Sequence, residues 1–483
     1  MTETVVDQLL ARAAAAEATH KWIEAVALYE VALVRAPDHV PAMLGAATAA
    51  RANGDHARAV IFLTRADRTE PGRADIAAAL GEALAATSRL PEAAAAFERA
   101  RAAKPLDARL AARLGVARLA AGDADGAVSA FDAALRLDPA EPHALSGLGS
   151  ALVAAGRPLA AVEAFRRTGE SRPHADRAAA LLSLGDMAGG FADLDGVATC
   201  PPWAARLPVW DGAPLDRPLL VWTGPDPLDL ITFASVLPLA RSLAAYLVLV
   251  APKPFVRLAS SIEGVGHVVA DNDDVGDWVR AAGAAAPLVG LPHRLGLTAG
   301  SFVPTGSLLA AEPMLADRWS ARLDLGRGKP AIGLVWGGGL RLDDLAPLAG
   351  IGDLRFVALE RVPSTMLARS STPSGWEVAD PPVRIEHPGP DFEAGVDARV
   401  DCAALISRID AIIAIDGLSL RLAGALGRPG VALLPAAASW VWRLEGEKTP
   451  RYPSLSLLRQ QPEKPLAALL AEVIHRVRDL VRR

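Results

Sequence analysis

The spacing of apolar residues divides the chain into two parts of different character. From the N-terminus to about residue 187, small and bulky apolar residues recur with one long fixed period, which favours a stack of paired helices. From residue 218 onward, short runs of aliphatic residues alternate with helical segments. Residues 188–217 are rich in Gly, Pro and Ala, and we expect them to form a linker.

The first part repeats itself every 34 residues. Prolines mark the period at Pro37, Pro71, Pro105, Pro139 and Pro173. Alanines lie in phase at Ala25, Ala59, Ala93, Ala127 and Ala161, each followed by a bulky residue at Tyr29, Leu63, Phe97, Phe131 and Phe165. A small alanine lets two helices approach closely, the bulky residue fills the gap, and proline stops the second helix. The period therefore predicts stacked helix hairpins.

This pattern resembles the tetratricopeptide repeat, in five units over about residues 6–173, with a further helix at about 175–187 that caps the stack. The resemblance implies a concave groove for a protein or peptide partner. Its predicted lining includes Leu44, Thr48, Arg51, Glu82, Val116, Leu119 and Ser150. Most groove positions are small or apolar, which favours an amphipathic or apolar segment as the partner. The alternative is an array that only spaces or dimerises.

The second part has the run pattern of buried parallel strands, whose two faces are both covered by helices. The runs are 218–222, 246–251, 267–270 and 287–291, and then 331–336, 355–360, 383–387, 411–416, 431–435 and 455–460. Two successive α/β series predict two Rossmann-like halves, residues 218–325 and 326–483. Ligands of such sheets bind beyond the carboxyl ends of the strands, so the turns that follow them are candidate sites.

From about Leu207 to the end, the chain resembles bacterial proteins that join tetratricopeptide repeats to a GT-B glycosyltransferase domain, related to heptosyltransferases and more distantly to O-GlcNAc transferases. The resemblance rests on "GLVWGG", "DCAALISRIDAIIAID", "LAGALGRPGVALLP" and "SWVWRLEGEKTPRYPSLSLLRQ". It implies an all-helical repeat solenoid followed by an α/β GT-B fold. It also implies transfer of a sugar from a nucleotide sugar to a protein acceptor, with flagellin as the model acceptor.

The resemblance assigns Asp229 the role of catalytic base, because it aligns with the aspartate of the family's first turn. The chain departs from that turn, since Asp226 and Leu228 replace its two glycines and Pro225 and Pro227 remove backbone donors. The alternative is that Asp229 is a helix N-cap.

On the donor side, the resemblance implies that two turns hold the diphosphate. The residues concerned are Gly337, Gly338, Arg341, Asp416, Gly417, Ser419 and Arg421. Glycine-turn amides and a helix N-terminus favour anions. The family has histidine where this chain has Arg421, and arginine holds phosphate but does not titrate as an acid. The alternatives are a merely flexible glycine turn, a solvated or salt-bridged Arg421, and a nucleophile elbow at Ser419 that lacks its last glycine.

Composition narrows the class of protein. The net charge of −5 and the scattered arginines disfavour nucleic acid as a partner. Two cysteines far apart in the chain suit a reducing compartment, and we expect a cytoplasmic protein without signal peptide or membrane span. Dispersed histidines predict metal-free chemistry. The family resemblance implies a nucleotide sugar as substrate, and we expect no cofactor. Three altered turns leave a second hypothesis, a catalytically degenerate transferase domain that serves as a scaffold or adaptor.

Overall fold

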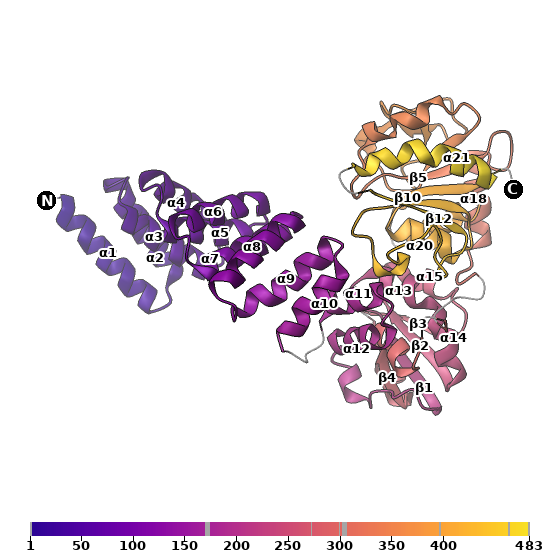
Figure 1. Cartoon of the computed structure of the whole chain (residues 1–483), viewed down its shortest axis with the longest axis horizontal. Helices are drawn as coiled ribbons and strands as arrows, with labels where there is room; N and C mark the ends of the chain where they lie inside the picture. Colours follow the sequence, from indigo (N-terminus) through magenta and orange to yellow (C-terminus); the bar gives the residue numbers. More distant parts are fainter. Residues whose placement is uncertain are drawn as a thin grey trace. The chain divides into compact units, whose positions relative to one another are not determined.

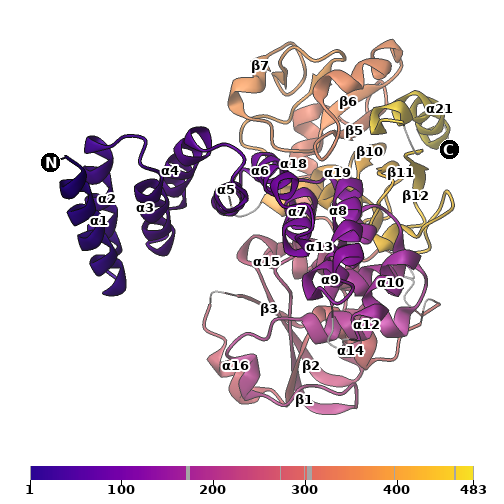
Figure 2. The same cartoon turned by 60° about the vertical axis from the view of Figure 1, so that its left-hand side comes forward.

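The structure of the chain is a computed structural model that describes residues 2–169, 174–271, 273–298, 300–301, 307–395, 398–461 and 464–481. The chain forms two compact units, residues 1–170 and 171–483. We call them the repeat array and the α/β unit. Figures 1 and 2 show the helices of the array in indigo to violet and the sheets of the α/β unit in pink to yellow.

The described residues of the repeat array form helix hairpins, each repeat supplying two helices. The helices are α1 (Thr2–Ala18), α2 (Trp22–Arg35), α3 (Val40–Ala52), α4 (His56–Thr69), α5 (Ala74–Ala86), α6 (Leu90–Ala103), α7 (Ala108–Ala120), α8 (Ala124–Leu137), α9 (Pro142–Ala154) and α10 (Pro158–Arg167). The predicted repeat solenoid is therefore confirmed, with the phased alanines such as Ala59 and Ala93 fully buried.

A glycine recurs on the first helix of several repeats, at Gly81, Gly115 and Gly149, for a packing reason. A Cβ added at Gly81 would lie 2.8 Å from the ring of Phe97, and one at Gly149 would lie 2.6 Å from the ring of Phe165. Each ring of a second helix thus rests on a glycine of the first helix. A larger residue at that glycine would push the two helices apart.

A sixth hairpin belongs to the α/β unit by its contacts. It consists of α11 (Ala175–Ser183) and α12 (Met187–Val197), which lies inside the segment predicted to be a linker. Two hydrogen bonds, both 2.6 Å long, join Arg177 on α11 to Asp193 on α12. Phe191 packs against Phe233 of the α/β unit, with ring centroids 6.4 Å apart. The repeat proline Pro173 lies outside the described residues.

The N-terminal half of the α/β unit contains a four-stranded parallel sheet in the order β3-β2-β1-β4. Its strands are β1 (Leu215–Trp222), β2 (Ala244–Ala251), β3 (His267–Ala270) and β4 (Ala284–Pro287). Its helices are α13 (Pro227–Phe233), η2 (Ala234–Val236), α14 (Leu237–Ser242), η3 (Lys253–Phe255), α15 (Val256–Ala259), α16 (Gly276–Ala281), η4 (Leu288–Gly290) and α17 (Leu291–Arg294), where η marks a 3₁₀ helix. The strand predicted at 287–291 is wrong, because Pro287 has no amide to continue the ladder and a 3₁₀ turn follows it.

The C-terminal half contains an eight-stranded sheet in the order β12-β11-β10-β5-β6-β9-β8-β7. Its strands are β5 (Ala331–Val335), β6 (Arg355–Ala358), β7 (Leu367–Arg369), β8 (Trp376–Val378), β9 (Ile385–Glu386), β10 (Ala411–Ile415), β11 (Gly430–Leu434) and β12 (Leu455–Arg459). Its helices are α18 (Pro313–Leu323), η5 (Leu342–Gly350), η6 (Ser364–Met366), α19 (Ala398–Ile406), α20 (Leu418–Ala425), η7 (Trp440–Trp442), η8 (Leu466–Leu469) and α21 (Leu470–Val481). The short antiparallel strands β7 and β8 were not among the predicted runs.

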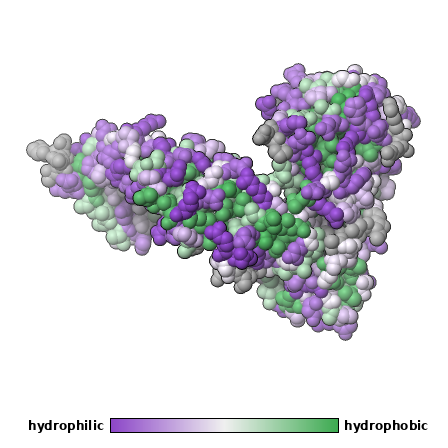
Figure 3. Space-filling view, viewed as in Figure 1, coloured by the Kyte–Doolittle hydropathy of each residue, from purple (hydrophilic) through white to green (hydrophobic). Residues whose placement is uncertain are grey.

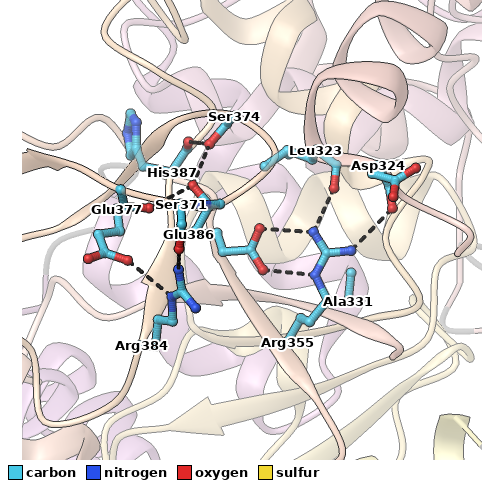
Figure 4. Close-up of polar contacts among 12 residues, drawn as sticks. Leu323, Asp324, Ala331, Arg355, Ser371, Ser374, Glu377, Arg384, Glu386 and His387 are labelled. Carbon is cyan, nitrogen blue, oxygen red and sulfur yellow. Dashed lines mark hydrogen bonds and ion pairs between the residues drawn. The ribbon is translucent and has the colours of Figure 1, made fainter. Parts of the chain in front are cut away.

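A buried ion pair ties the middle of this sheet to the helix before it. Arg355 on β6 donates to both carboxylate oxygens of Glu386 on β9, at 2.8 and 2.9 Å. The same guanidinium donates to the carbonyls of Leu323 and Asp324 at the end of α18 (Figure 4). The pair therefore holds α18 against the second sheet, although this segment was predicted to belong to the first half.

Within the described segments, no helix combines the length and the apolar character that crossing a membrane requires.

Candidate functional site

The strand order of the C-terminal half changes direction between β5 and β10, which are neighbours in the sheet but far apart in sequence. Such a switch point is the usual ligand position in doubly wound sheets. The two predicted donor turns follow these two strands, and the predicted base follows β1. The three turns are therefore described in order.

In the turn after β1, Asp226 caps the helix α13. Its carboxylate accepts the amide hydrogen of Leu228 at 2.9 Å. The alternative that Asp229 is the N-cap is therefore wrong, since Asp229 lies inside the first turn of α13. A Cβ added at Gly224 would come within 3.3 Å of Asp229 Oδ2, so this glycine leaves room for the carboxyl group.

The environment of Asp229 disfavours its charged form. Burial raises its pKa to about 7, and the negative charge of Asp226 contributes, while the positive charge of Arg421 opposes the rise. A carboxyl group that titrates near neutral pH is suited to exchange a proton with a ligand hydroxyl. This is the property that a general base requires.

Arg421 lies on α20 after β10 and is only 6% exposed. Its Nε donates to Asp416 Oδ1 at 3.2 Å and its Nη2 lies 3.4 Å from Asp416 Oδ2. Its Nη1 donates to Thr232 Oγ1, on α13 of the other half, at 2.7 Å. Of the alternatives for this residue, the solvated one is wrong, and the salt-bridged one is correct.

Arg451 is a second buried arginine beside this cluster and was not predicted. It is 5% exposed, and its Nη1 donates to Ser235 Oγ at 2.7 Å. Burial lowers its pKa, and the charge of Arg421 adds to this effect, while Tyr452 opposes it. The residue lies in the quoted motif "TPRYP", but no spacing in the sequence relates it to Ser235.

The turn after β5 is already occupied by a carboxylate. Glu360, which follows β6, accepts the amide hydrogen of Trp336 at 2.9 Å, and the amide of Gly337 also bonds to it. Burial raises the Glu360 pKa, and these two amides oppose that rise. Of the amides predicted to cradle phosphate, that of Gly337 thus already serves a protein acid. Sequence reasoning missed Glu360, although it ends one of the predicted strand runs.

The glycines of this turn are needed for its backbone. Gly338 has a φ of 61° and Gly339 a φ of 126°, both in the region that favours glycine. Arg341 follows them and its side chain is 81% exposed, with Nε 3.9 Å from Asp344. Arg341 is therefore not part of the buried cluster around Arg421.

Gly417 and Ser419 lie at the start of α20, which begins at Leu418. Gly417 is the N-cap residue, with an extended φ of 177°. Ser419 Oγ lies 3.6 Å from the sulfur of the buried Cys402. The nucleophile-elbow alternative would require an imidazole beside this hydroxyl, and the contact described is with a thiol.

The predicted groove residues of the array lie on the first helices of successive repeats. Arg51 on α3 and Arg113 on α7 both form ion pairs with Glu82 on α5, so a chain of charges crosses three repeats. Val116 is 54% exposed. Leu44, Leu119 and Ser150 are half-buried, and Thr48 is exposed. The hydroxyl of Thr48 donates a hydrogen bond to the carbonyl of Leu44. Arg113 was not predicted, because its role depends on a partner two helices away.

Apolar side chains also reach the surface of the array elsewhere. Figure 3 shows green, apolar areas among the polar ones on this unit. Exposed large apolar residues of the array include Ile23, Val34, Leu106 and Leu159.

Among the described residues, no group of three or more His, Cys, Asp and Glu side chains is placed to hold a metal ion.

Comparison with known proteins identifies the repeats. Models of the tetratricopeptide repeat match residues 10–74, 63–108, 78–142 and 118–184. Residues 10–184 of the chain therefore contain tetratricopeptide repeats, and such repeats indicate protein–protein interaction.

The chain is also similar to Protein FlbA of Caulobacter vibrioides, with 29% identity over 313 residues. That match covers 58% of this chain and 50% of FlbA, so the chain matches about half the length of this curated relative. Among solved structures, it is similar to MamA from Desulfovibrio magneticus, with 21% identity, a TM-score of 0.32, and coverage of 34% of this chain and 93% of MamA. YrrB, described as a TPR protein with an unusual peptide-binding site, has 21% identity and a TM-score of 0.31, with coverage of 33% of this chain and 82% of YrrB.

Proposed function

We propose that the chain is a protein glycosyltransferase of the GT-B type, in which the repeats recruit a protein acceptor and the α/β unit transfers a sugar to it from a nucleotide sugar. The observation that carries the proposal is that Arg421 lies close enough to both Asp229 and Arg451 for its charge to affect each of them. Asp229 comes from the first half, and Arg421 and Arg451 come from the second. Flagellin is the acceptor that the family resemblance suggests.

The chemistry assigned to each group follows from its charge. Asp229, with a pKa of about 7, accepts the proton of the acceptor hydroxyl as that oxygen attacks the sugar. The bond from the sugar to the nucleoside diphosphate breaks, and the diphosphate leaves with an additional negative charge. Arg421 and Arg451 neutralise that charge in a buried setting, where electrostatic interactions are strong.

A second candidate function is a scaffold that binds protein partners without transferring sugar. The specific observation in its favour is Glu360, whose carboxylate already accepts the amides of the turn after β5. A phosphate group at that turn would meet a negative charge in place of free donors. In this case the repeats alone carry the function.

Calorimetry with UDP-, GDP- and CMP-sugars distinguishes the two functions. Binding of a donor by the full chain is expected for the transferase, and absence of heat with all donors tested favours the scaffold. With a binding donor in hand, Asp229→Asn should abolish transfer and preserve binding. Asp343→Asn, at an exposed position, is the matched control. Normal turnover of Asp229→Asn would remove this residue from the role of base.

Glu360→Gln provides a separate arm of the same experiment. The amide oxygen can still accept the Trp336 hydrogen bond, but the negative charge is lost. If the turn after β5 opposes phosphate, the affinity for the nucleoside diphosphate should rise about tenfold, or about 1.4 kcal/mol. Glu377→Gln, at a half-buried carboxylate on β8 that pairs with Arg384, is the control. An unchanged affinity would mean that the diphosphate does not approach this turn.

A further inference from the structure

The contact between the two α/β halves is largely apolar. Leu230 and Phe233 of α13 belong to the same cluster of buried residues as Leu420 of α20 and Trp442. Phe233 also packs on Trp440, with ring centroids 6.2 Å apart. Figure 1 shows α13 and α20 on the facing sides of the halves, and these helices are in contact. Apolar burial stabilises such a contact but is non-directional, so it does not by itself fix the angle between the halves.

Two hydrogen bonds cross this apolar contact from the same side. Arg421 Nη1 donates to Thr232 Oγ1, and Arg451 Nη1 donates to Ser235 Oγ, both at 2.7 Å. Thr232 and Ser235 are three residues apart, at the end of α13 and in η2, so one helical turn of the first half receives both arginines. Thr232 is 2% exposed. Its hydrogen bond to Arg421 therefore forms only when α20 lies in the right position.

The acceptors in both bonds are neutral hydroxyls. A hydroxyl oxygen satisfies a guanidinium donor without cancelling its charge. The two arginines are close enough for the charge of one to affect the other, so they repel each other within the contact. Both arginines belong to the second half, so their repulsion does not hold the halves at any one angle, and apolar packing alone would allow a small rotation of the halves. The hydroxyls oppose that rotation, because each bond is lost if the halves turn.

We infer that Thr232 and Ser235 are positioning residues that fix the relative orientation of the two halves by holding Arg421 and Arg451 at the contact between them. The inference does not depend on the transferase function. It requires only that the orientation of the halves be set by these two polar bonds, with apolar packing supplying most of the stability.

The test measures the distance between two spin labels, one on each half of the full chain. Asp216→Cys and Asp343→Cys provide exposed label sites, with Cys200→Ser to remove the exposed native thiol; Cys402 is buried. The double variant Thr232→Val/Ser235→Ala removes both hydroxyls with little change in volume. We expect its distance distribution to become broader than that of the parent protein or to shift. Thr232→Ser/Ser235→Thr, which keeps both hydroxyls, should restore the parent distribution.

A parent-like distribution in Thr232→Val/Ser235→Ala overturns the inference, whether or not the melting temperature falls. In that case the hydroxyls contribute stability at most, and apolar packing sets the orientation. If the double variant does not fold, Ser235→Ala is measured alone, since Ser235 is only partly buried. A parent-like distribution in that variant contradicts the role of Ser235. Failure of the hydroxyl-retaining variant to restore the distribution contradicts the role of the hydroxyls.

Discussion

The turns after β5 and β10 follow neighbouring strands of one sheet, but the buried side chains beside them carry opposite charges. After β5, the Glu360 carboxylate accepts backbone amides that a ligand anion would otherwise use. After β10, the buried guanidinium of Arg421 faces Asp416 and the other half of the unit. A glycine-rich turn after a strand is therefore weak evidence for a phosphate site, because a side chain from the next strand can fill it.

The largest expected effect comes from removing the charge after β10. Arg421→Met replaces the guanidinium by a long apolar side chain. It leaves the largely buried Asp416 without its guanidinium partner. We expect the free energy of unfolding to fall by about 4 kcal/mol, measured by urea denaturation. Arg341→Met, at a side chain that is 81% exposed, should change it by less than about 0.5 kcal/mol. Equal effects of the two substitutions would contradict the difference that we infer between the buried Arg421 and the exposed Arg341.

The next effect is the pH dependence that Asp229 contributes. Its pKa is about 7 in the folded protein against 3.8 for the ordinary side chain, so between these values the folded state binds more protons than the unfolded state. Its contribution to stability is therefore fully present below about pH 4 and is lost as the pH rises to 7, by on the order of 3 kcal/mol.

Asp229→Asn does not titrate and should lack this part of the pH dependence. The measurement is the difference in unfolding free energy between the two proteins from pH 4 to pH 8. This difference isolates Asp229 from other buried acids such as Glu360, whose pKa is also raised. A difference that stays constant over the range would show that Asp229 titrates normally in the folded protein.

The smallest expected effect is the loss of stability when one glycine from each turn is replaced by alanine. Gly338→Ala places a Cβ at a φ of 61° and 2.7 Å from Ile415, so it should cost about 2 kcal/mol. Gly417→Ala has an extended φ of 177° and a nearest neighbour at 3.9 Å, so it should cost about 0.5 kcal/mol or less. Thermal unfolding of the two variants is the measurement. A greater loss for Gly417→Ala would reverse the assignment of strain to the turn after β5.

The sequence was most informative where one residue type repeats at a fixed spacing. The period of 34 predicted the repeat array, and the apolar runs predicted most of the parallel strands. It failed for α12, whose glycines and short polar residues are poor helix formers, because burial of Phe191 decides that helix. It failed for β4, where three alanines gave no strand signal.

Of the candidate site residues, those carried by the family motifs were found in the sequence, and their assigned roles remain predictions. Glu360 and Arg451 were missed, because each gains its meaning from a contact with a distant segment. Arg451 meets Ser235 across 216 positions of the chain. No local pattern encodes such a pairing, which depends on how the two halves pack.

The ring-on-glycine contacts of the array limit how its length can change. One inserted residue rotates the rest of a helix by about 100°, which carries the glycine away from its ring. A full unit of 34 residues restores both partners, as the sets Gly81 with Phe97 and Gly115 with Phe131 already show. Variants of this array should therefore gain or lose whole repeats and rarely single residues.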